Sequence, residues 1–254
     1  MIYDAVVTRY STLSRLSSIA QDQWGLLTRR QAELAGVSSA TVQRLASEGI
    51  LEREAQGVYH LAGAPLADQA ALRAAWLQLA PGVLAWERTA KQGVVSHRSA
   101  AAMFSLGDLA ADRHEFTLPT RRQSRRADVR LHQRQLDQGE WIILDGLPVT
   151  RPARIAADLL DDNEDTEAVA HVVADAIRAV HDYPGTFADA LAPHSTRFGL
   201  RRGDGLALLR WLLELVGDPD TSRWLAEAGR HVAGASLAGG KPQEAASATD
   251  VGAS

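Results

Sequence analysis

The sequence predicts an α+β protein that is mainly helical and consists of two folded parts. Apolar residues recur every three or four positions along much of the chain, as in amphipathic helices, and short runs alternate as strands do. Gly63-Ala64-Pro65 has the composition of a linker, because Gly and Pro interrupt both patterns. We therefore expect one domain over residues 1–62 and a second over 66–234. The Ala-, Gly- and Ser-rich residues 235–254 are expected to form a disordered tail.

The composition is that of a water-soluble protein with a substantial core: 46% of the 254 residues are hydrophobic and 23% are charged. The formal net charge is −4, so any binding of nucleic acid depends on local basic patches. Cysteine is absent, which excludes disulfides and thiolate metal sites and fits a reducing cytoplasm. We expect no contact with a membrane, because the sequence has neither a signal-peptide pattern nor eighteen consecutive uncharged apolar residues.

The first part contains signals for two short helices joined by a tight turn. Thr28 is a suitable N-cap for a helix that ends at Gly36, and Ser38 or Ser39 can cap a second helix that ends at Gly49. In the second helix Val42, Leu45 and Ala46 fall on one face, so Thr41, Gln43 and Arg44 are expected to point toward solvent. An amphipathic helix over residues 4–22 is expected to pack beneath these two, with Trp24 as a core aromatic at the junction.

Two β-prone runs follow directly. Ile50–Arg53 and Val58–Leu61 are separated by a turn, Glu54–Gly57, that has Gly late in the loop, so they predict a hairpin. Two helices, a short turn and a hairpin in this order indicate a winged helix-turn-helix, whose second helix can enter the major groove of DNA. The alternative interpretation is a plain packing unit, since the apolar pattern would be the same in any small helical core.

Candidate DNA contacts follow from this arrangement. Gln and Arg on the second helix can pair with base edges, and the start of the preceding helix can bind a phosphate through backbone amides and Arg charges. Arg53 is a further candidate in the wing. The predicted DNA-contacting residues are Thr28, Arg29, Arg30, Ser38, Ser39, Thr41, Gln43, Arg44, Gln56, Tyr59 and His60.

The charge of the first part is too low for it to bind DNA tightly by itself. Residues 1–62 carry six arginines and six acidic residues, so a homodimer on repeated DNA sites or a second basic surface is expected. Residues 113–134 contain seven arginines against two acidic residues, and a further pair lies near residue 201. A solvated loop is the alternative interpretation of such a charge run. The predicted second basic surface consists of Arg121, Arg122, Arg125, Arg126, Arg130, Arg201 and Arg202.

The second part combines helices with a few strands and predicts an α+β domain with a small antiparallel sheet. Ser96 and Thr150 are expected to cap helices, the first of which runs through Phe104 and the second of which has Pro152 in its first turn. The helix predicted over residues 206–216 is apolar nearly all round and must be buried. The predicted strands cover residues 114–118, 129–132, 141–144 and 147–149, and the predicted helices cover 67–80, 96–104, 150–160, 166–180 and 206–216.

The sequence gives no positive indication of catalysis. His97 lies between Ser96 and Ser99, but neighbours in sequence do not supply a base and an orienting acid in the required geometry. Lysine occurs only at positions 91 and 241, so the Asp and Glu-x-Lys arrangement of magnesium nucleases is not completed. The acidic run DDNED lacks the spacing of an EF-hand. We therefore expect no catalytic residue, no metal site and no cofactor.

The chain resembles a known family. WGLLTRRQAELAGVSSATVQRLASEGILEREAQGVYHLAGAP, at 24–65, is similar to the N-terminal winged helix-turn-helix of the AbiEi-type antitoxins. These proteins are transcriptional regulators of abortive-infection (type IV) toxin–antitoxin systems. VVSHRSAAAMFSL at 94–106, HEFTLP at 114–119 and DGLPVTRPARIAADLL at 145–160 resemble the second domain of the same group. Together the resemblance spans about residues 10–215, and it rests on the order and spacing of the motifs.

The resemblance implies a cytoplasmic, non-enzymatic repressor that binds repeats in the double-stranded DNA of its own operator. It also implies an antitoxin that counteracts a partner toxin of the nucleotidyltransferase-like class. The residues themselves support only DNA binding. Two alternatives remain: a stand-alone transcription factor whose second domain dimerises or senses a ligand, and a diverged nuclease.

Overall fold

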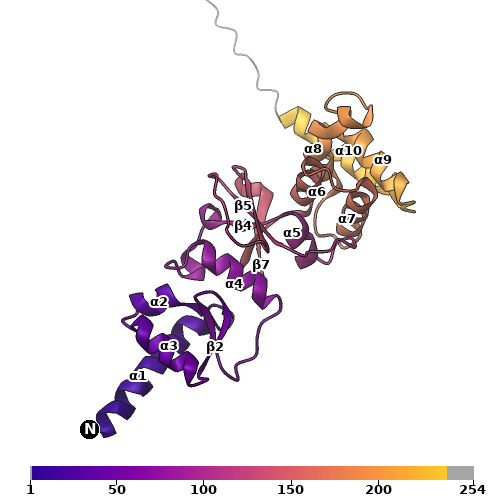
Figure 1. The fold of residues 1–254 in the computed structure, drawn as a ribbon. Helices are drawn as coiled ribbons and strands as arrows, with labels where there is room; N and C mark the ends of the chain where they lie inside the picture. Colours follow the sequence, from indigo (N-terminus) through magenta and orange to yellow (C-terminus); the bar gives the residue numbers. More distant parts are fainter. Residues whose placement is uncertain (1, 239–254) are drawn as a thin grey trace, which may run out of the picture.

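The computed structural model describes the backbone of residues 2–238 and the side chains of residues 10–230, which form α-helices and two β-sheets (Figure 1). The α+β class predicted from the sequence is confirmed. Within this described part, no helix has the length and apolar character that a membrane span requires. The last helix continues to Ala238, so the first four residues of the expected tail are helical, and residues 239–254 lie outside the described residues.

The N-terminal residues form three helices and a three-stranded antiparallel sheet with the order β1-β3-β2. The turn and the hairpin lie where the sequence predicts them, and residues Val42 and Leu45 of the second short helix are buried with Leu16 and Leu27. The elements are α1 (Ile2–Gln21), β1 (Leu26–Thr28), α2 (Arg29–Leu34), α3 (Ser39–Ser47), β2 (Leu51–Ala55) and β3 (Val58–Leu61).

Helix α4 (Ala70–Leu79) connects the two sheets: it packs against the N-terminal strands on one side and against the larger sheet on the other (Figure 1). Its Trp76 is fully buried and donates from Nε1 to the Gly93 carbonyl at 2.8 Å. Arg88 lies over the Trp76 ring and donates to the carbonyls of Trp76, Leu77 and Ala80 at 2.6–2.7 Å. Arg88 thereby satisfies free carbonyls at the C-terminus of α4, where Pro81 follows the helix.

The larger sheet has five strands in the order β6-β5-β4-β8-β7. The β5–β6 and β4–β8 pairs are parallel, so the sheet is mixed. The prediction of a small antiparallel sheet in the second part is therefore wrong. The strands are β4 (Val94–Val95), β5 (His114–Leu118), β6 (Val129–Gln133), β7 (Trp141–Leu144) and β8 (Leu147–Thr150). Parallel neighbours require a long connection that returns the chain to the same edge. Residues 119–128 make this return, and they carry four of the arginines singled out above.

Helices cover the rest of the second part. Helix α5 follows β4, and α6–α10 form a C-terminal bundle in which α8 packs against α6, α9 and α10. The sequence did not predict α8 or α10. The helices are α5 (His97–Met103), α6 (Pro152–Asp161), α7 (Thr166–Arg178), α8 (Pro184–Leu191), α9 (Gly205–Leu215) and α10 (Thr221–Ala238), with 3-10 turns η1 (Ala85–Glu87), η2 (Ala90–Gln92), η3 (Gln138–Glu140) and η4 (Ala192–Phe198).

Two local predictions for these helices are wrong. Thr150 does not cap α6, because it is the last residue of β8, pairs with Trp141 and is buried in the sheet; Arg151 occupies the N-cap position. In α9 the buried stripe is Leu208, Leu209, Leu212 and Leu213, whereas Trp211 and Leu215 are partly exposed. Helix α9 packs against α7, α8 and α10, which leaves one side of the helix open to solvent.

The contact between α8 and α9 is tight enough to test by mutation. A Cβ atom at Gly205 would lie 1.8 Å from the Ala188 carbonyl oxygen, whereas one at Gly229 in α10 would meet nothing within 4 Å. We expect Gly205→Ala to lower the free energy of unfolding by about 1–3 kcal/mol or more, because the backbones must separate. Gly229→Ala is expected to be neutral or to stabilise the helix by about 0.5–1 kcal/mol. Urea unfolding checks both values, and equal stabilities for the two variants would contradict this packing.

Candidate nucleic-acid interface and a buried histidine cluster

Helices α2 and α3 begin with the caps that the sequence predicts. The Thr28 hydroxyl accepts from the Gln31 amide at 3.0 Å, and the Gln31 side chain accepts in turn from the Thr28 amide at 2.9 Å. Ser38 caps α3 by accepting from the Thr41 amide at 3.2 Å. Gly36 allows the turn between the helices because its φ is +80°. These local bonds set the direction in which α3 leaves the turn.

The exposed side of α3 carries few free polar groups. Gln43 is exposed and forms no side-chain hydrogen bond within the described residues, and Arg44 is exposed but pairs with Glu48 at 2.8 Å. Ser38 and Thr41 bond to each other through their hydroxyls at 3.0 Å. Ser39 donates to Glu33, so its hydroxyl is also engaged. Gln43 and Arg44 are therefore the side chains on this helix best placed to reach a ligand.

A groove of about 750 Å³ lies where α2, α3 and the hairpin meet α4 and the loop of residues 119–128. It brings together two basic segments that are about ninety residues apart in sequence. Gln43 and Gln56 lie on its wall, and Glu33 is the acidic residue among those that line it. The arginines that line it are Arg29, Arg30, Arg53, Arg122, Arg125 and Arg126.

These arginines differ in how far their charge is already compensated. Arg30 and Arg29 lie 3.2 and 3.8 Å from Glu33, whose pKa is lowered by the hydrogen bond from Ser39 and by Arg30, so Glu33 stays ionised. Arg126 binds Asp128 and Gln78. Arg125 is exposed and has no ion pair or hydrogen bond in the part of the chain that the structure describes. The groove thus keeps an excess of positive charge, with Arg125 as its least compensated member.

Three predicted contacts are buried, although Thr28 and Tyr59 are among the residues that line the groove. Thr28 is fully buried, and its hydroxyl donates to the Pro81 carbonyl. Tyr59 and His60 are only 8% and 6% exposed, and His60 lies 3.3 Å from Glu52 and within 4.0 Å of Glu54, whose charges would repel a phosphate. β3 is the central strand of its sheet, which explains the burial of these residues.

The predicted second basic surface is divided in the structure. Arg122, Arg125 and Arg126 line the groove, and exposed Arg121 is their neighbour on the loop. Arg130 does not line the groove: it is on the opposite face of β6 and pairs with Asp162. Arg201 and Arg202 lie between η4 and α9 and do not line the groove. Helix α9 belongs to the C-terminal bundle, which lies away from α3 (Figure 1).

A buried glutamine pair fixes the groove by holding the N-terminal helices against the segment after α4. Gln23 and Gln31 exchange two side-chain hydrogen bonds of 3.0 and 2.9 Å. Gln31 also donates to the Val83 carbonyl at 3.0 Å, and the Ala85 amide donates to Gln23 at 2.8 Å. Trp24 adds a bond from its indole to the Asp145 carbonyl at 3.0 Å. Two hydrogen bonds of this pair cross the junction, one to the Val83 carbonyl and one from the Ala85 amide, and they hold the N-terminal helices against the segment after α4.

This junction predicts the effect of removing one amide. Gln31→Ala removes the bonds that Gln31 makes with Gln23, the Val83 carbonyl and the Thr28 amide in a buried site, and each group left unsatisfied costs about 1–3 kcal/mol. We expect the free energy of unfolding to fall by at least about 2 kcal/mol in total. Gln43→Ala, on the open side of α3, should change it by no more than about 0.5 kcal/mol. Chemical denaturation measures both, and a small effect of Gln31→Ala would show that the junction is loose.

The comparison with known families bears on the N-terminal segment. Residues 14–62, which include α2, α3 and the β2–β3 hairpin, match the family model described as transcriptional regulator, AbiEi antitoxin. This segment is of the AbiEi antitoxin type. The resemblance predicted from the sequence is thereby confirmed over these residues. No curated protein matches the chain.

Beyond the AbiEi segment, strands β5 and β6 form a polar face that the sequence analysis did not identify. In their parallel register Glu115 lies opposite Arg130, and Thr117 lies opposite His132. Because side chains alternate along a strand, these four residues share one face. The apolar residues between them, such as Phe116 and Leu131, face the other side, where Leu131 lines the groove.

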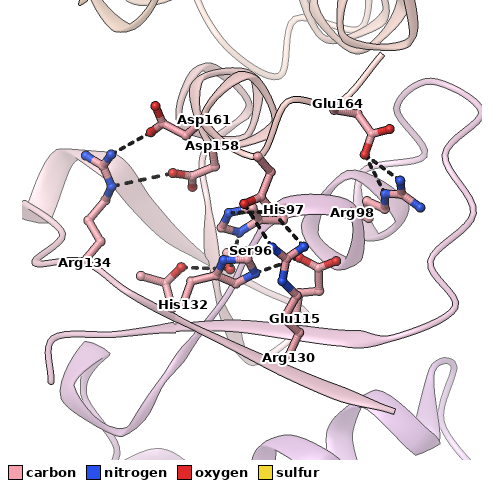
Figure 2. Close-up of polar contacts among 12 residues, drawn as sticks. Ser96, His97, Arg98, Glu115, Arg130, His132, Arg134, Asp158, Asp161 and Glu164 are labelled. Carbon is pink, nitrogen blue, oxygen red and sulfur yellow. Dashed lines mark hydrogen bonds and ion pairs between the residues drawn. The ribbon is translucent and has the colours of Figure 1, made fainter. Parts of the chain in front are cut away.

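Helices α5 and α6 bring further ligand atoms to this polar face (Figure 2). The His97 ring, at the start of α5, stacks on His132 with 3.5 Å between centroids. His132 and Glu115 are hydrogen-bonded at 2.9 Å, and His97 Nε2 lies 3.8 Å from Asp162, the residue after α6. Arg130 holds the same Asp162 carboxylate at 2.9 and 3.1 Å. Four side chains from four segments thus place nitrogen and carboxylate ligand atoms within 4.8 Å of one another.

Ser96 occupies the N-cap position of α5, as the sequence predicts, but its hydroxyl forms no capping bond and orients His97 instead. Its hydroxyl lies 2.9 Å from His97 Nδ1 and accepts from the Thr117 hydroxyl at 2.9 Å. His97 has a φ of +52°, a left-handed conformation that is uncommon for a non-glycine residue. Burial, followed by the charges of His132 and nearby arginines, lowers the pKa of His97 to about 2, so the imidazole is neutral at pH 7.

An ion-pair network continues from the cluster along α6. Arg134 binds Asp161 at 2.8 Å and approaches Asp158 at 3.7 Å, as Figure 2 shows. Arg154 lies 2.8 Å from Asp158. Burial raises the pKa of Asp158 to about 6, although both arginines act in the opposite direction. Asp158 and Asp162 are four residues apart and therefore lie on the same side of α6. Asp158 belongs to the ion-pair network and Asp162 to the histidine cluster, so the two groups are adjacent.

Proposed function

We propose that the chain is a DNA-binding transcriptional regulator in which residues 1–62 act as a winged helix-turn-helix domain and residues 66–234 as an α+β effector domain. In this proposal α3 is the recognition helix and the β2–β3 hairpin is the wing. The observation that supports it most directly is the arginine-lined groove beside α3, to which both parts of the chain contribute. The AbiEi match over residues 14–62 is consistent with it.

The groove and the exposed side of α3 beside it would then contact different parts of the DNA, with Gln43 in the groove wall and Arg44 next to it on α3. Gln43 and Arg44 would read base edges from the exposed side of α3, since Gln and Arg can pair bidentately with adenine and guanine. Ser38, Ser39 and Thr41 lie beside them at the start of the helix. Arg29 and Arg30, with Gln56 in the wing, would contact phosphates and set the register.

The loop arginines would supply the charge that the first domain lacks. The charges of residues 1–62 sum to zero, so one copy offers few phosphate contacts. Arg121, Arg122, Arg125 and Arg126 would extend the same track on the other side of the groove. A homodimer on operator repeats would double these contacts and increase the specificity.

The biological role that we propose follows the AbiEi family. The protein would repress its own operon in the cytoplasm and counteract a nucleotidyltransferase-like toxin encoded beside it, without catalysis of its own. The alternative is a stand-alone regulator whose second domain dimerises or senses a ligand. A toxin gene adjacent to this one, together with rescue of toxin-expressing cells by the protein, separates the two roles.

The loop contribution predicts a change in salt dependence. We expect Arg122→Ala/Arg125→Ala to weaken binding to the upstream DNA of its own gene and to reduce the slope of log K against log salt by about 1–2, because each lost phosphate contact removes about 0.9. Arg201→Ala/Arg202→Ala removes the same charge away from the groove and should leave the slope unchanged. Fluorescence anisotropy at several salt concentrations measures both. Equal slopes for the two double variants would exclude the loop from the interface.

The helix α3 contribution predicts a loss of discrimination between sequences. Gln43→Ala and Arg44→Ala should each reduce the preference for operator over random DNA by about 1–3 kcal/mol, because a base-edge contact is lost. Arg223→Ala is the matched control, since Arg223 pairs with Glu227 on α10 just as Arg44 pairs with Glu48 on α3. Mobility shifts with both DNAs give the ratio. Wild-type protein that binds neither DNA at moderate salt would contradict the whole proposal.

A further inference from the structure

The cluster of His97, Glu115, His132 and Asp162 has the ligand set of a transition-metal site. Two imidazoles and two carboxylates can bind Zn²⁺ in a tetrahedral arrangement with bonds of about 2.0–2.2 Å, which places ligand atoms about 3.4 Å apart. The ligand atoms here lie within 4.8 Å of one another, and the His132–Glu115 pair is already at 2.9 Å. The widest pair must therefore close by about 1.4 Å, which side-chain rotation can supply.

The groups around the cluster support this assignment. Metal-bound histidines usually donate their second ring nitrogen to a neighbouring group that fixes the ring. Ser96 lies 2.9 Å from His97 Nδ1 and is itself held by Thr117, so His97 Nε2 is left for a cation. The left-handed backbone at His97 turns the ring into the cluster, and such conformations are concentrated at functional sites.

The charge of the site also favours a dication. The ligand set contains two carboxylates, Glu115 and Asp162, and one guanidinium, that of Arg130, lies beside Asp162. Asp162 also lies at the C-terminal end of α6, where the helix dipole favours positive charge. Arg130 holds both oxygens of Asp162 at 3.1 and 2.9 Å. A bound metal would share this carboxylate with Arg130: it would take one oxygen and leave the other to the guanidinium.

A path for the ion is present. A hollow of about 270 Å³ is lined by Glu115, Asp162, Arg98 and Arg130, so the two carboxylates are accessible from the surface. An ion that enters would replace the hydrogen bond between His132 Nε2 and Glu115. A neutral His132 that binds the ion through Nε2 carries its one proton on Nδ1, so no proton need be released. The hollow also leaves room for a water molecule as a further ligand.

We propose that His97, Glu115, His132 and Asp162 form a binding site for one Zn²⁺ ion that ties β5 and β6 to α5 and α6. The site is distinct from the DNA-binding groove, because it lies on the opposite face of β6. The proposal does not depend on DNA binding, so it can succeed or fail independently of the proposed function.

The test uses the full-length protein stripped of metal by a chelator and titrated with ZnCl₂ in competition with a chromophoric chelator. We expect one Zn²⁺ per chain. Glu115→Gln keeps the shape of the side chain and His132→Ala lies on an edge strand, so both variants should fold; each should lose at least about 10–100-fold in affinity. His171→Ala, an exposed histidine on α7, is the matched control and should bind as the wild type does.

Two readouts make the result decisive. Co²⁺ bound by four nitrogen and oxygen ligands should give an intense visible spectrum in the wild type and in His171→Ala, but not in Glu115→Gln. Zn²⁺ should raise the melting temperature of the wild type more than that of Glu115→Gln. No Zn²⁺ binding by the wild type, or equal binding by the wild type and both cluster variants, would overturn the proposal and leave the cluster as a hydrogen-bonded network.

Discussion

The buried pair Gln23–Gln31 is the interaction on which the arrangement of the two parts depends. An amide buried without partners is unfavourable, and here both amides form all of their hydrogen bonds only when α2 lies against residues 83–85. Hydrogen bonds require a particular direction and distance. The apolar contacts of Leu26 and Val58 with the larger core are not directional and would allow the two parts to shift relative to each other. The pair therefore fixes the distance between the AbiEi segment and α4, and this distance sets the width of the groove.

A second constraint comes from the parallel pairing of β5 and β6. An antiparallel pair could have been joined by a tight turn, but a parallel pair must be joined by a chain that returns along the sheet. Residues 119–128 make that return beside α4, where Arg122 donates to the Leu79 carbonyl and Arg126 to Gln78. Topology thus places a basic loop opposite α2. The excess of positive charge at the groove is a consequence of the fold, in a chain whose net charge is −4.

The sequence predicted what depends on neighbouring residues and failed where distant segments meet. The caps at Thr28 and Ser38, the Gly36 turn and the β2–β3 hairpin are local signals, and all are present. Thr150 was wrongly predicted to cap α6 because strand pairing with β7 competes for it, which no local pattern reveals. The parallel register of β5 and β6 is equally nonlocal.

The candidate sites show the same division. The arginine run was visible in the sequence, but its position across the groove from Arg29 and Arg30 was not. The histidine cluster left a signal in the sequence: Arg130 and His132 alternate along β6 with Arg134 directly after it, and Arg154, Asp158 and Asp162 recur every four residues along α6 and its C-cap. In both elements, polar residues line one side and most other residues are apolar. The sequence alone does not show that these two polar sides face each other, because this depends on α6 packing on that face of the sheet.

Strand β6 separates the two candidate sites, because its two faces carry different side chains. One face contributes Val129 and Leu131 to the wall of the groove, and the other contributes Arg130 and His132 to the cluster. Buried ion pairs are poor stabilisers, since apolar replacements of similar volume are often as stable or more stable by about 1–4 kcal/mol. A sheet that needed only stability could have been covered with apolar side chains on both faces. On the charged face, Arg130 is exposed at the edge strand, as charges on edge strands often are, so the comparison with apolar replacements applies to His132 and Glu115, whose side chains are only 14% and 6% exposed. The proposed ligand would account for this buried polar pair.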